Sequence, residues 1–436
     1  MIYTLNVMPT ASISRTPKLR GPSSPQAAWY PYYAGFSEEF AKEALSSASI
    51  KCGEWVVDPW NGSGTTISTA LSLGLSARGY DLNPVMVLVA KARCLEPSEY
   101  SCLRPLAAEI TKQSKKTLEL KPYDPLLTWF CPNSVASVRA IEAALQRLLI
   151  DDRICTSIKN RGADDVSDIA AFFYVVIFRT IRQILRPFLT SNPTWIKQPR
   201  FQSARLRPAP STVRDIFHSL ATRMIPPADG HSRASIRGEK TISVASSESL
   251  PLPDSSVHCV LGSPPYCTRI DYAVATSPEL AMLGYGLEDE FDTLRRGLIG
   301  TSTVPTDVPE IQPNLGRRCL RFLKRLSQHP SKASSTYYYK NHAQYFVSMA
   351  TSLSEIRRIL KTGGQCILVV QDSYYKDIHN DLPDILTEMA ALRALRLSDR
   401  IDFPSGRTLA GVNPGAREYR TTFSAVESVL TFEAAT

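Results

Sequence analysis

The nine residues DPWNGSGTT (Asp58–Thr66) form the turn on which the predicted fold depends. They continue EWVVDPW, a short buried-strand pattern, and they open GTTISTALSLGL, a helical pattern that Gly74 ends. Gly62 and Gly64 allow a tight turn and a close approach of the backbone to a ligand. A strand that passes through a glycine turn into a helix is typical of an open α/β sheet, where nucleotide-like cofactors bind at the first such turn.

The segments around this turn alternate between helix and strand patterns. Upstream, GFSEEFAKEALSSAS has helical spacing, with Ser37 as its N-cap and Glu38 and Glu39 in its first turn. Downstream, SARGYDLNP predicts a strand and PVMVLVAKARCL a helix, and the later KTISVAS, SSVHCVLG and QCILVVQDS predict strands. The closing EYRTTFSAVESVLTFEA predicts a strand hairpin. We therefore expect an α/β fold: a doubly wound, mostly parallel Rossmann-like sheet with a C-terminal strand hairpin and a helical insertion.

Two interruptions divide the chain into regions. Residues 1–28 are rich in Ser, Pro and Thr and predict a flexible tail. Residues 96–235 contain two long helical patterns, DPLLTWFCPNSVASVRAIEAALQRLL and DIAAFFYVVIFRTIRQILRPFL, and predict a basic helical insertion. Residues 268–335 are irregular and predict a second insertion. The main domain, which carries the chemical motifs, is then expected from residues 29–95 together with 236–436.

Composition excludes several classes of protein. A hydrophobic content of 43% and a charged content of 21% in 436 residues are typical of a globular chain. The longest apolar run, Ala170–Phe178, is too short to span a bilayer, and the N-terminus lacks the pattern of a secretory signal. The nine cysteines are dispersed without a CxxC pair, which favours reduced thiols in a cytoplasm and argues against structural zinc. We expect no metal and no membrane partner.

The net charge of +9 is concentrated in one part of the chain. Residues 96–235 contain 20 Lys and Arg against 13 Asp and Glu. Within them, Lys197–Arg214 has five basic residues and no acidic one, as does Gly316–Arg325 in the second insertion. Such stretches favour a polyanionic partner, although spaced cations are also typical of a solvated helix face. Arg179, Arg182 and Arg186 recur at helical spacing, and both interpretations, contact with the polyanion and a solvated face, apply to them. Both insertions remain candidates for contact with such a partner, through Lys197, Arg200, Arg205, Arg207, Arg317 and Arg318.

A second motif, VLGSPPYCTRIDY (Val260–Tyr272), ends the strand SSVHCVLG. Two successive prolines cannot continue a strand or a helix, so Pro264 and Pro265 predict a rigid, extended turn. That turn fixes the hydroxyl of Ser263 and the ring of Tyr266. Pro-Pro-Tyr also occurs as a peptide ligand of small domains, but this alternative leaves the glycine turn upstream unexplained.

An acidic residue, Asp81, ends the strand that follows the glycine turn. A carboxylate at this position can accept hydrogen bonds from both hydroxyls of a ribose. The turn is not a phosphate loop, because GxxxxGK[ST] is absent, and it lacks the third glycine of the dinucleotide fingerprint. By itself, a glycine turn followed by a distal acid is as compatible with a structural turn beside a strand-end Asp as with a cofactor site.

In this order, DPWNGSGTT, GYDLNP and SPPY resemble the motifs of the amino-methyltransferases, which methylate exocyclic amines of DNA bases with S-adenosylmethionine. This chain has Trp60 where the family usually has Phe. YYAGFSEEF, RILKTGGQCILVVQDS and ESVLTF extend the resemblance over the catalytic part, residues 29–95 and 236–436, whereas the insertions match less clearly. The resemblance implies a Rossmann-like methyltransferase fold, S-adenosylmethionine as cofactor and double-stranded DNA as partner.

The resemblance also implies roles for individual residues. The glycine turn would wrap the methionine end of the cofactor, Asp81 would hold the ribose, and Phe36 would pack against the ligand. Where the family often has an Asp for the adenine amine, this chain has Ser246, which can hydrogen-bond but carries no charge. The implied cofactor residues are Phe36, Asp58, Pro59, Asn61, Gly62, Ser63, Gly64, Thr65, Thr66, Asp81, Leu82, Asn83 and Ser246.

The implied catalytic residues are Ser263, Pro264, Pro265 and Tyr266. An exocyclic amine is a poor nucleophile because its lone pair is delocalised into the ring. The Ser263 hydroxyl and the Pro264 carbonyl would accept its hydrogens and favour a tetrahedral nitrogen. Tyr266 would offer a face on which a base flipped out of the duplex stacks.

The main hypothesis is a site-specific DNA methyltransferase that modifies cytosine N4, because Ser at the first motif position is commoner in cytosine enzymes. The alternatives are adenine N6 methylation of DNA, methylation of an RNA base, and a non-catalytic nucleic-acid-binding protein of this fold. The expected setting is the cytoplasm of a bacterium, in restriction-modification or phage defence, with a partner nuclease or other defence components.

Overall fold

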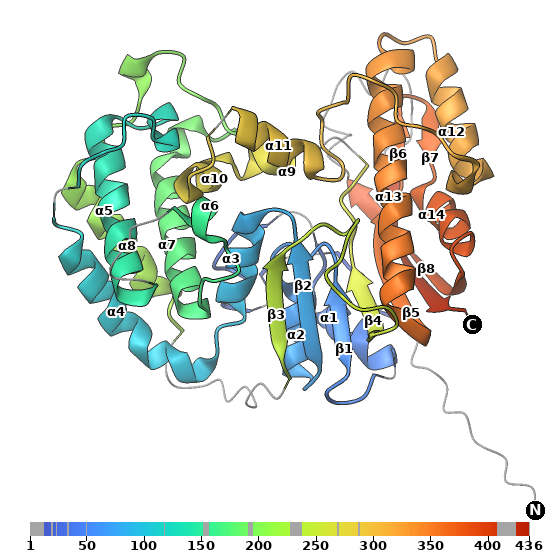
Figure 1. The fold of residues 1–436 in the computed structure, drawn as a ribbon, viewed down its shortest axis with the longest axis horizontal. Helices are drawn as coiled ribbons and strands as arrows, with labels where there is room; N and C mark the ends of the chain where they lie inside the picture. The colour runs from blue at the N-terminus through green and yellow to red at the C-terminus, as the bar shows by residue number, and fades with distance from the viewer. Residues whose placement is uncertain are drawn as a thin grey trace, which may run out of the picture.

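In the computed structural model, residues 13–18, 21–22, 24–32, 35–48, 50–116, 118–150, 157–190, 195–226, 238–267, 270–286, 288–407 and 424–435 are described. Figure 1 shows a twisted sheet with helices on both faces and a further helical block, α4 to α8, beside it. Within the described residues, no helix combines the length and the hydrophobicity needed to cross a bilayer.

Seven strands of the described chain form one sheet in the order β3-β2-β1-β4-β5-β9-β8. The first five run parallel, and β9 is antiparallel to both of its neighbours, β5 and β8. The fold is therefore the expected doubly wound Rossmann-like sheet with an antiparallel pair at its C-terminal edge. The strands are β1 (Trp55–Asp58), β2 (Ser76–Asp81), β3 (Lys240–Val244), β4 (Val257–Gly262), β5 (Leu360–Gln371), β8 (Leu395–Arg407) and β9 (Ser424–Ala434), and the short β6 (Ser373–Tyr375) and β7 (Ile378–Asn380) pair separately.

Alternate residues of the strands face two cores, one on each side of the sheet. Val56 and Leu261 are buried with helices α1 to α3, whereas their neighbours Val57 and Val260 are buried with α12 to α14. This alternation follows from the pleat of a strand, and near-continuous apolar strands are typical of a sheet covered on both faces. The helices are α1 (Glu38–Ser47), α2 (Thr65–Ser72), α3 (Pro84–Arg93), α12 (Arg317–Gln328), α13 (Tyr339–Ile359) and α14 (Leu382–Ala391).

The helices of residues 96–235 extend the first core instead of forming a separate one. Helix α7 packs against α3, and the buried residues of both belong to one cluster. The block contains α4 (Tyr100–Gln113), the 3₁₀ helix η2 (Pro125–Thr128), α5 (Pro132–Leu149), α6 (Ile158–Arg161), α7 (Asp168–Ile184) and α8 (Pro210–Met224). Helices α9 (Tyr272–Ala275), α10 (Ser277–Leu283) and α11 (Asp289–Gly297) lie in the second insertion, which is more helical than the sequence indicates.

Several local predictions are confirmed and others are wrong. Ser37 caps α1 as expected, accepting a hydrogen bond from the Phe40 amide. The first long helical pattern is two elements, because Pro132 begins a new helix at its first position. The expected C-terminal strand hairpin is present, with β9 antiparallel to β8, and residues 408–423 lie outside the described part.

The N-terminal segment expected to be a flexible tail is partly packed. Ile13 is buried, and Ser14 donates a hydrogen bond to Glu43 of α1 at 2.8 Å. Gln26 is also buried and donates to the hydroxyl of Tyr100. Residues 1–12 lie outside the described part. The Ser and Pro content that indicated a tail therefore belongs, from residue 13 onward, to a segment that packs on α1 and α4.

Candidate active site

The glycine turn and the Ser-Pro-Pro-Tyr motif meet at the C-terminal ends of β1 and β4. These strands are neighbours, with Val57 opposite Val260, and the strand order reverses between them. A Cβ atom placed on Gly262 would lie 2.9 Å from Asp58 Oδ1, so only a glycine lets the two motifs come this close. Open α/β sheets bind ligands at such a switch point, so the ends of the neighbouring strands β1 and β4 (Figure 1) define the candidate site.

Asp58 is a buried carboxylate without a cationic partner. It is 3% exposed and accepts hydrogen bonds from Thr66 Oγ1 at 2.6 Å and from the Trp60 amide at 3.1 Å. Burial raises its pKa to about 7, and these two donors offset only part of that effect. In the described chain no Lys or Arg forms an ion pair with Asp58. An ammonium group placed beside it would relieve the cost of this buried charge.

Gly62 and Gly64 have the left-handed backbone that the turn requires. Their φ angles are +48° and +79°, which favour glycine. A Cβ on Gly64 would lie 2.8 Å from the Ala90 side chain, and one on Gly62 would lie 2.9 Å from Cε1 of Tyr32. Space and backbone angle therefore both exclude a side chain at these two positions. Tyr32, which the motif analysis did not select, lies directly on the turn.

Asp81 joins the second strand to the same turn. Its carboxylate accepts hydrogen bonds from the amides of Gly62 and Asn83, each at 2.9 Å. Burial raises its pKa to about 6. Each carboxylate oxygen accepts one backbone amide and keeps a lone pair for a further donor, so the geometry leaves room for the expected ribose hydroxyls.

Asn83, Ser63 and Thr65, which are expected to touch the cofactor, have structural partners. Asn83 caps α3 through the Val85 amide and donates to Thr276 Oγ1 at 2.9 Å. Ser63 and Thr65 both accept hydrogen bonds from Arg93, a 6% exposed residue that also pairs with Glu38 at 2.7 Å. The Asn61 side chain lies against Gly79, where its Oδ1 is buried without a partner.

Arg93 is therefore a positioning residue that the motifs did not indicate. It connects α1, the glycine turn and α3 through hydrogen bonds from one guanidinium group. In the sequence, Arg93 stands in the last turn of a helix, where a cation is typical on general grounds. Only the packing of three separate segments reveals its role.

The remaining cofactor candidates lie around this centre. Phe36 is 4% exposed, and its ring centroid lies 5.3 Å from that of Phe40. Pro59 is buried beside Gly262, and Leu82 lies against Gly297 of the second insertion. The Ser246 hydroxyl accepts a hydrogen bond from the Glu248 amide at 3.2 Å, so it already stabilises its own turn.

Hydrogen bonds to the neighbouring strand and helices hold the Ser-Pro-Pro-Tyr motif. Ser263 Oγ donates to the Val369 carbonyl of β5 at 2.9 Å. The Tyr345 hydroxyl from α13 donates to the Pro265 carbonyl at 3.0 Å, and the Tyr266 amide donates to the Tyr272 hydroxyl at 3.4 Å. Because the Ser263 proton is committed to a carbonyl, its oxygen offers lone pairs to the site and acts there as an acceptor.

Three tyrosines lie around the motif. Burial raises the pKa of Tyr266, with smaller contributions from Glu427 and Tyr272. Burial raises the pKa of Tyr272 to about 12 and that of Tyr32 well above its usual value, with Asp81 and Asp58 contributing to the latter. These phenols stay neutral near pH 7, so they supply rings and hydrogen bonds and not a base.

The candidate DNA contacts differ in how free their charges are. Lys197, Arg200 and Arg207 are exposed, and Arg205 is half-buried. On α12, Arg317 is exposed but Arg318 pairs with Asp384 at 2.6 Å. The spaced arginines of α7 have partners inside the protein. Arg179 donates to the carbonyls of Ala28 and Trp29, and Arg182 pairs with the fully buried Glu279.

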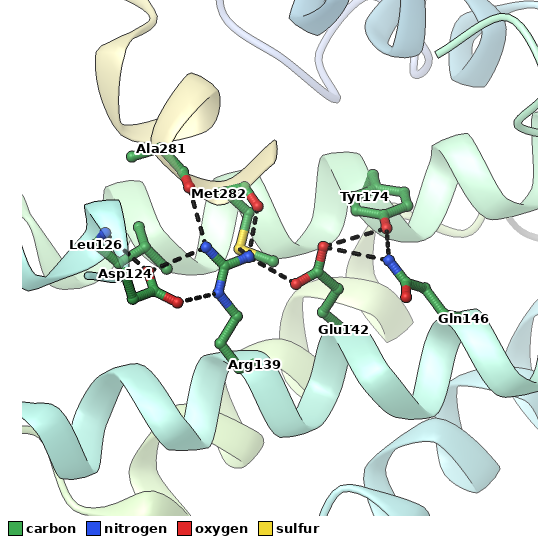
Figure 2. Close-up of polar contacts among 8 residues, drawn as sticks. All are labelled: Asp124, Leu126, Arg139, Glu142, Gln146, Tyr174, Ala281 and Met282. Atoms are coloured by element: carbon green, nitrogen blue, oxygen red, sulfur yellow. Dashed lines mark hydrogen bonds and ion pairs between the residues drawn. The ribbon is translucent and has the colours of Figure 1, made fainter. Parts of the chain in front are cut away.

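A buried polar network joins the helical block to the segment that follows the catalytic motif. Arg139 of α5 pairs with Asp124 and Glu142 at 2.7 and 2.6 Å. It also donates to the carbonyls of Ala281 and Met282 near the end of α10 (Figure 2). Figure 2 shows the network continuing from Glu142 through Tyr174 and Gln146. Helices α5 and α7 therefore hold α10, and with it the chain leaving Tyr266.

Comparison with known proteins shows which proteins this chain is similar to. No family model matches the sequence. The chain is 22% identical over 429 residues to the Type II methyltransferase M.AvaI of Nostoc sp. (strain PCC 7120 / SAG 25.82 / UTEX 2576), covering 92% of this chain and 85% of that protein. It is 23% identical over 281 residues to the Type II methyltransferase M.BsoBI of Geobacillus stearothermophilus, covering 59% and 52%. A solved geranyl diphosphate methyltransferase in complex with GPP and sinefungin matches with a TM-score of 0.31 at 9% identity, covering 91% and 76%.

These sequence relatives confirm the resemblance that the motifs indicate. The sheet order is that of the expected Rossmann-like methyltransferase fold, and the glycine turn meets the Ser-Pro-Pro-Tyr motif at its switch point. The chain is similar over nearly its whole length to one Type II methyltransferase and over 59% of its length to another.

Proposed function

We propose that this protein is a site-specific DNA methyltransferase that moves a methyl group from S-adenosylmethionine to the exocyclic amine of a flipped base, with cytosine N4 as the target. One observation carries the proposal: the contact between Asp58 and Gly262 places the cofactor turn against the residue that precedes Ser263. Donor and acceptor sites that share one crevice convert a bimolecular transfer into one between pre-positioned groups.

The residues around the glycine turn fit the cofactor. Asp58 is a buried carboxylate with a raised pKa and would accept the α-ammonium group of the methionine moiety. Asp81 would accept the ribose hydroxyls through the lone pairs that its two amide donors leave free. Phe36, Leu82 and Ser246 would border the ligand. When bound, S-adenosylmethionine supplies a methyl group activated by its sulfonium.

Ser263 and Pro264 would prepare the amine. The Ser263 oxygen is an acceptor, because its proton is donated to Val369. Together with the Pro264 carbonyl it would hold the two amine hydrogens, directing the nitrogen lone pair out of the plane of the base. Tyr266 would stack on the base, which must leave the duplex to reach this crevice. No general base has to remove a proton from the amine before methyl transfer, which agrees with the high pKa of the neighbouring phenols.

The choice of cytosine follows from the serine at the first motif position. Adenine N6 is the alternative target, and an RNA base is the alternative substrate class. We place the reaction in a bacterial restriction-modification setting with a partner nuclease, as the resemblance implies. The exposed cations Lys197, Arg200 and Arg207 support a nucleic-acid substrate, with Arg205 as a further contact.

A labelling experiment tests the proposed function. The protein is incubated with methyl-labelled S-adenosylmethionine and either duplex DNA or RNA of matched sequence, with Tyr266→Ala as the matched control. We expect label in the DNA only and none with the variant. Label in RNA alone would reject the DNA substrate, and bound cofactor without transfer to either would favour the non-catalytic alternative.

A further inference from the structure

A surface on the helical block combines exposed aromatic rings with unpaired cations. Trp195 is 52% and Phe201 is 72% exposed, and Lys197, Arg200 and Arg207 lie on the same stretch. We call these five residues the aromatic–basic surface. Exposed apolar side chains mark binding sites when they gather with polar recognition groups.

Backbone hydrogen bonds hold this stretch in place. The Trp129 indole donates to the Lys197 carbonyl at 3.1 Å, and the Lys197 amide donates to Phe188 at 2.9 Å. Further along, Leu206 exchanges backbone hydrogen bonds with Trp129 and Cys131 at 2.9 and 3.0 Å. Ile196, which lies between Trp195 and Lys197 in the chain, is 5% exposed. The rings are therefore exposed on an anchored backbone, with the intervening residue packed inward.

The charge of the surface is not balanced by acidic residues. Lys197–Arg214 contains no Asp or Glu, and no side chain of the surface forms an ion pair within the described chain. The half-buried arginines of the same block, Arg139 and Arg182, are each paired with carboxylates. Unpaired cations beside exposed rings fit an anionic partner with flat faces, which is the chemistry of DNA.

The surface is connected to the base pocket through rigid contacts. Trp129 directly follows η2, whose capping residue Asp124 pairs with Arg139. Arg139 in turn holds the carbonyls at the end of α10 (Figure 2). Helix α10 belongs to the segment that leaves Tyr266. The pocket motif and the exposed rings are thus attached to one packed scaffold.

We propose that Trp195 and Phe201 stack on bases of the DNA beside the flipped target, while Lys197, Arg200 and Arg207 hold the phosphates. This inference rests on the proposed function and commits to DNA as the partner. Apolar side chains that enter a duplex stabilise a distorted base step, and extrusion of a base leaves faces of its neighbours open. The rings would bind those open faces.

The salt dependence of duplex affinity distinguishes stacking by the rings from phosphate binding by the cations. Duplex affinity is measured by fluorescence anisotropy over a salt series, in the presence of sinefungin, for the wild type and for Trp195→Ala/Phe201→Ala. We expect an affinity loss of about 10- to 100-fold with an unchanged salt slope. Lys197→Ala/Arg200→Ala should instead lower the magnitude of the slope by about 1.8, because two phosphate contacts release fewer counterions. Leu392→Ala, at a 56% exposed residue after α14, is the matched control and should bind like the wild type.

Cofactor binding and thermal unfolding of each variant show that the fold is intact. Wild-type affinity in Trp195→Ala/Phe201→Ala would overturn the inference, as would a loss of affinity equal to that of Leu392→Ala. Methyl transfer is measured separately, at saturating DNA. If the wild type binds duplex through the rings but transfers no methyl group, the surface stands and the proposed function fails.

Discussion

The Ser263–Tyr266 motif and the aromatic–basic surface are built in opposite ways. In the motif, the Ser263 hydroxyl, the Pro265 carbonyl and the Tyr266 amide all have partners in the protein. In the surface, the backbone is anchored, but the rings of Trp195 and Phe201 project into solvent. Transfer chemistry needs groups held in fixed positions, whereas a DNA-binding surface needs groups that are still free to bind.

Because of this difference, substitutions in the two regions should cause two kinds of defect, one in methyl transfer and one in DNA binding. Substitutions in the motif should lower kcat and leave DNA affinity unchanged, because they alter groups that only the flipped base contacts. Substitutions in the surface should lower DNA affinity and leave kcat at saturating DNA unchanged. A variant that lowers both would mean that the two regions are not independent.

The largest effect is expected at Tyr266. Tyr266→Ala should reduce methyl transfer by at least about 10³-fold, because the base loses its stacking face and its orientation. Cofactor affinity should stay within about twofold by calorimetry, since Asp58 and Asp81 are untouched. Tyr266→Phe is the matched control and should remain active, because the ring is retained and the phenol is neutral. Equal loss of transfer and cofactor binding would show that Tyr266 is structural.

A smaller effect is expected for Asp58→Asn. Cofactor affinity should fall by about 10- to 100-fold, because the ammonium group loses a buried carboxylate. Since the pKa of Asp58 in the folded protein is about 7, wild-type affinity should rise as pH rises through 7 and the carboxylate ionises. Titration calorimetry from about pH 6 to 8 checks this, with a flat profile expected for the variant. A wild-type profile without this rise would contradict the assignment.

The raised pKa of Asp58 also affects the free energy of unfolding in the absence of cofactor. Between about pH 4 and 7 the folded protein keeps the Asp58 proton that the unfolded chain has lost. The free energy of unfolding should therefore fall as pH rises through this range, and Asp58→Asn should remove that part of the decrease. Denaturant unfolding at several pH values measures it. A decrease of the same size in the variant would assign it to other groups.

A moderate effect is expected for Tyr345→Phe. The variant loses one hydrogen bond to the Pro265 carbonyl and keeps the buried ring. We expect kcat to fall about 5- to 10-fold with little change in KM for DNA, since a neutral hydrogen bond contributes about 1 kcal/mol. Steady-state kinetics measure both constants, and thermal unfolding controls for the fold. An unchanged kcat would mean that α13 does not position the motif.

The smallest effect is expected on α12, the other strongly basic stretch. Its cations alternate with the buried Cys319 and Phe322, as on a solvated amphipathic helix, and Arg318 is paired with Asp384. Arg317→Ala/Arg321→Ala should therefore change duplex affinity by less than about twofold, against a larger loss for Lys197→Ala/Arg200→Ala. Anisotropy titrations compare the pairs. A greater loss from α12 would reverse the ranking of the two insertions.

The sequence predicts those features that depend on neighbours along the chain. The cap at Ser37, the glycine turn and the strand ending at Gly262 all follow from short patterns, and the structure contains each of them. Arg93 and Tyr345 could not be found in this way, because their partners come from distant segments. Arg182 was misleading for the same reason: its helical spacing indicated a solvated face, but Glu279 binds it in the interior.

The most direct test of the account is the identity of the methylated nucleoside. Unmethylated duplex DNA is treated with the protein and S-adenosylmethionine, digested to nucleosides and analysed by mass spectrometry. We expect N4-methylcytosine in DNA treated with the wild-type protein and none in DNA treated with Tyr266→Ala. N6-methyladenine would contradict the assignment of the base to Ser263, and the absence of any methylated nucleoside would contradict the central claim that this crevice transfers a methyl group to DNA.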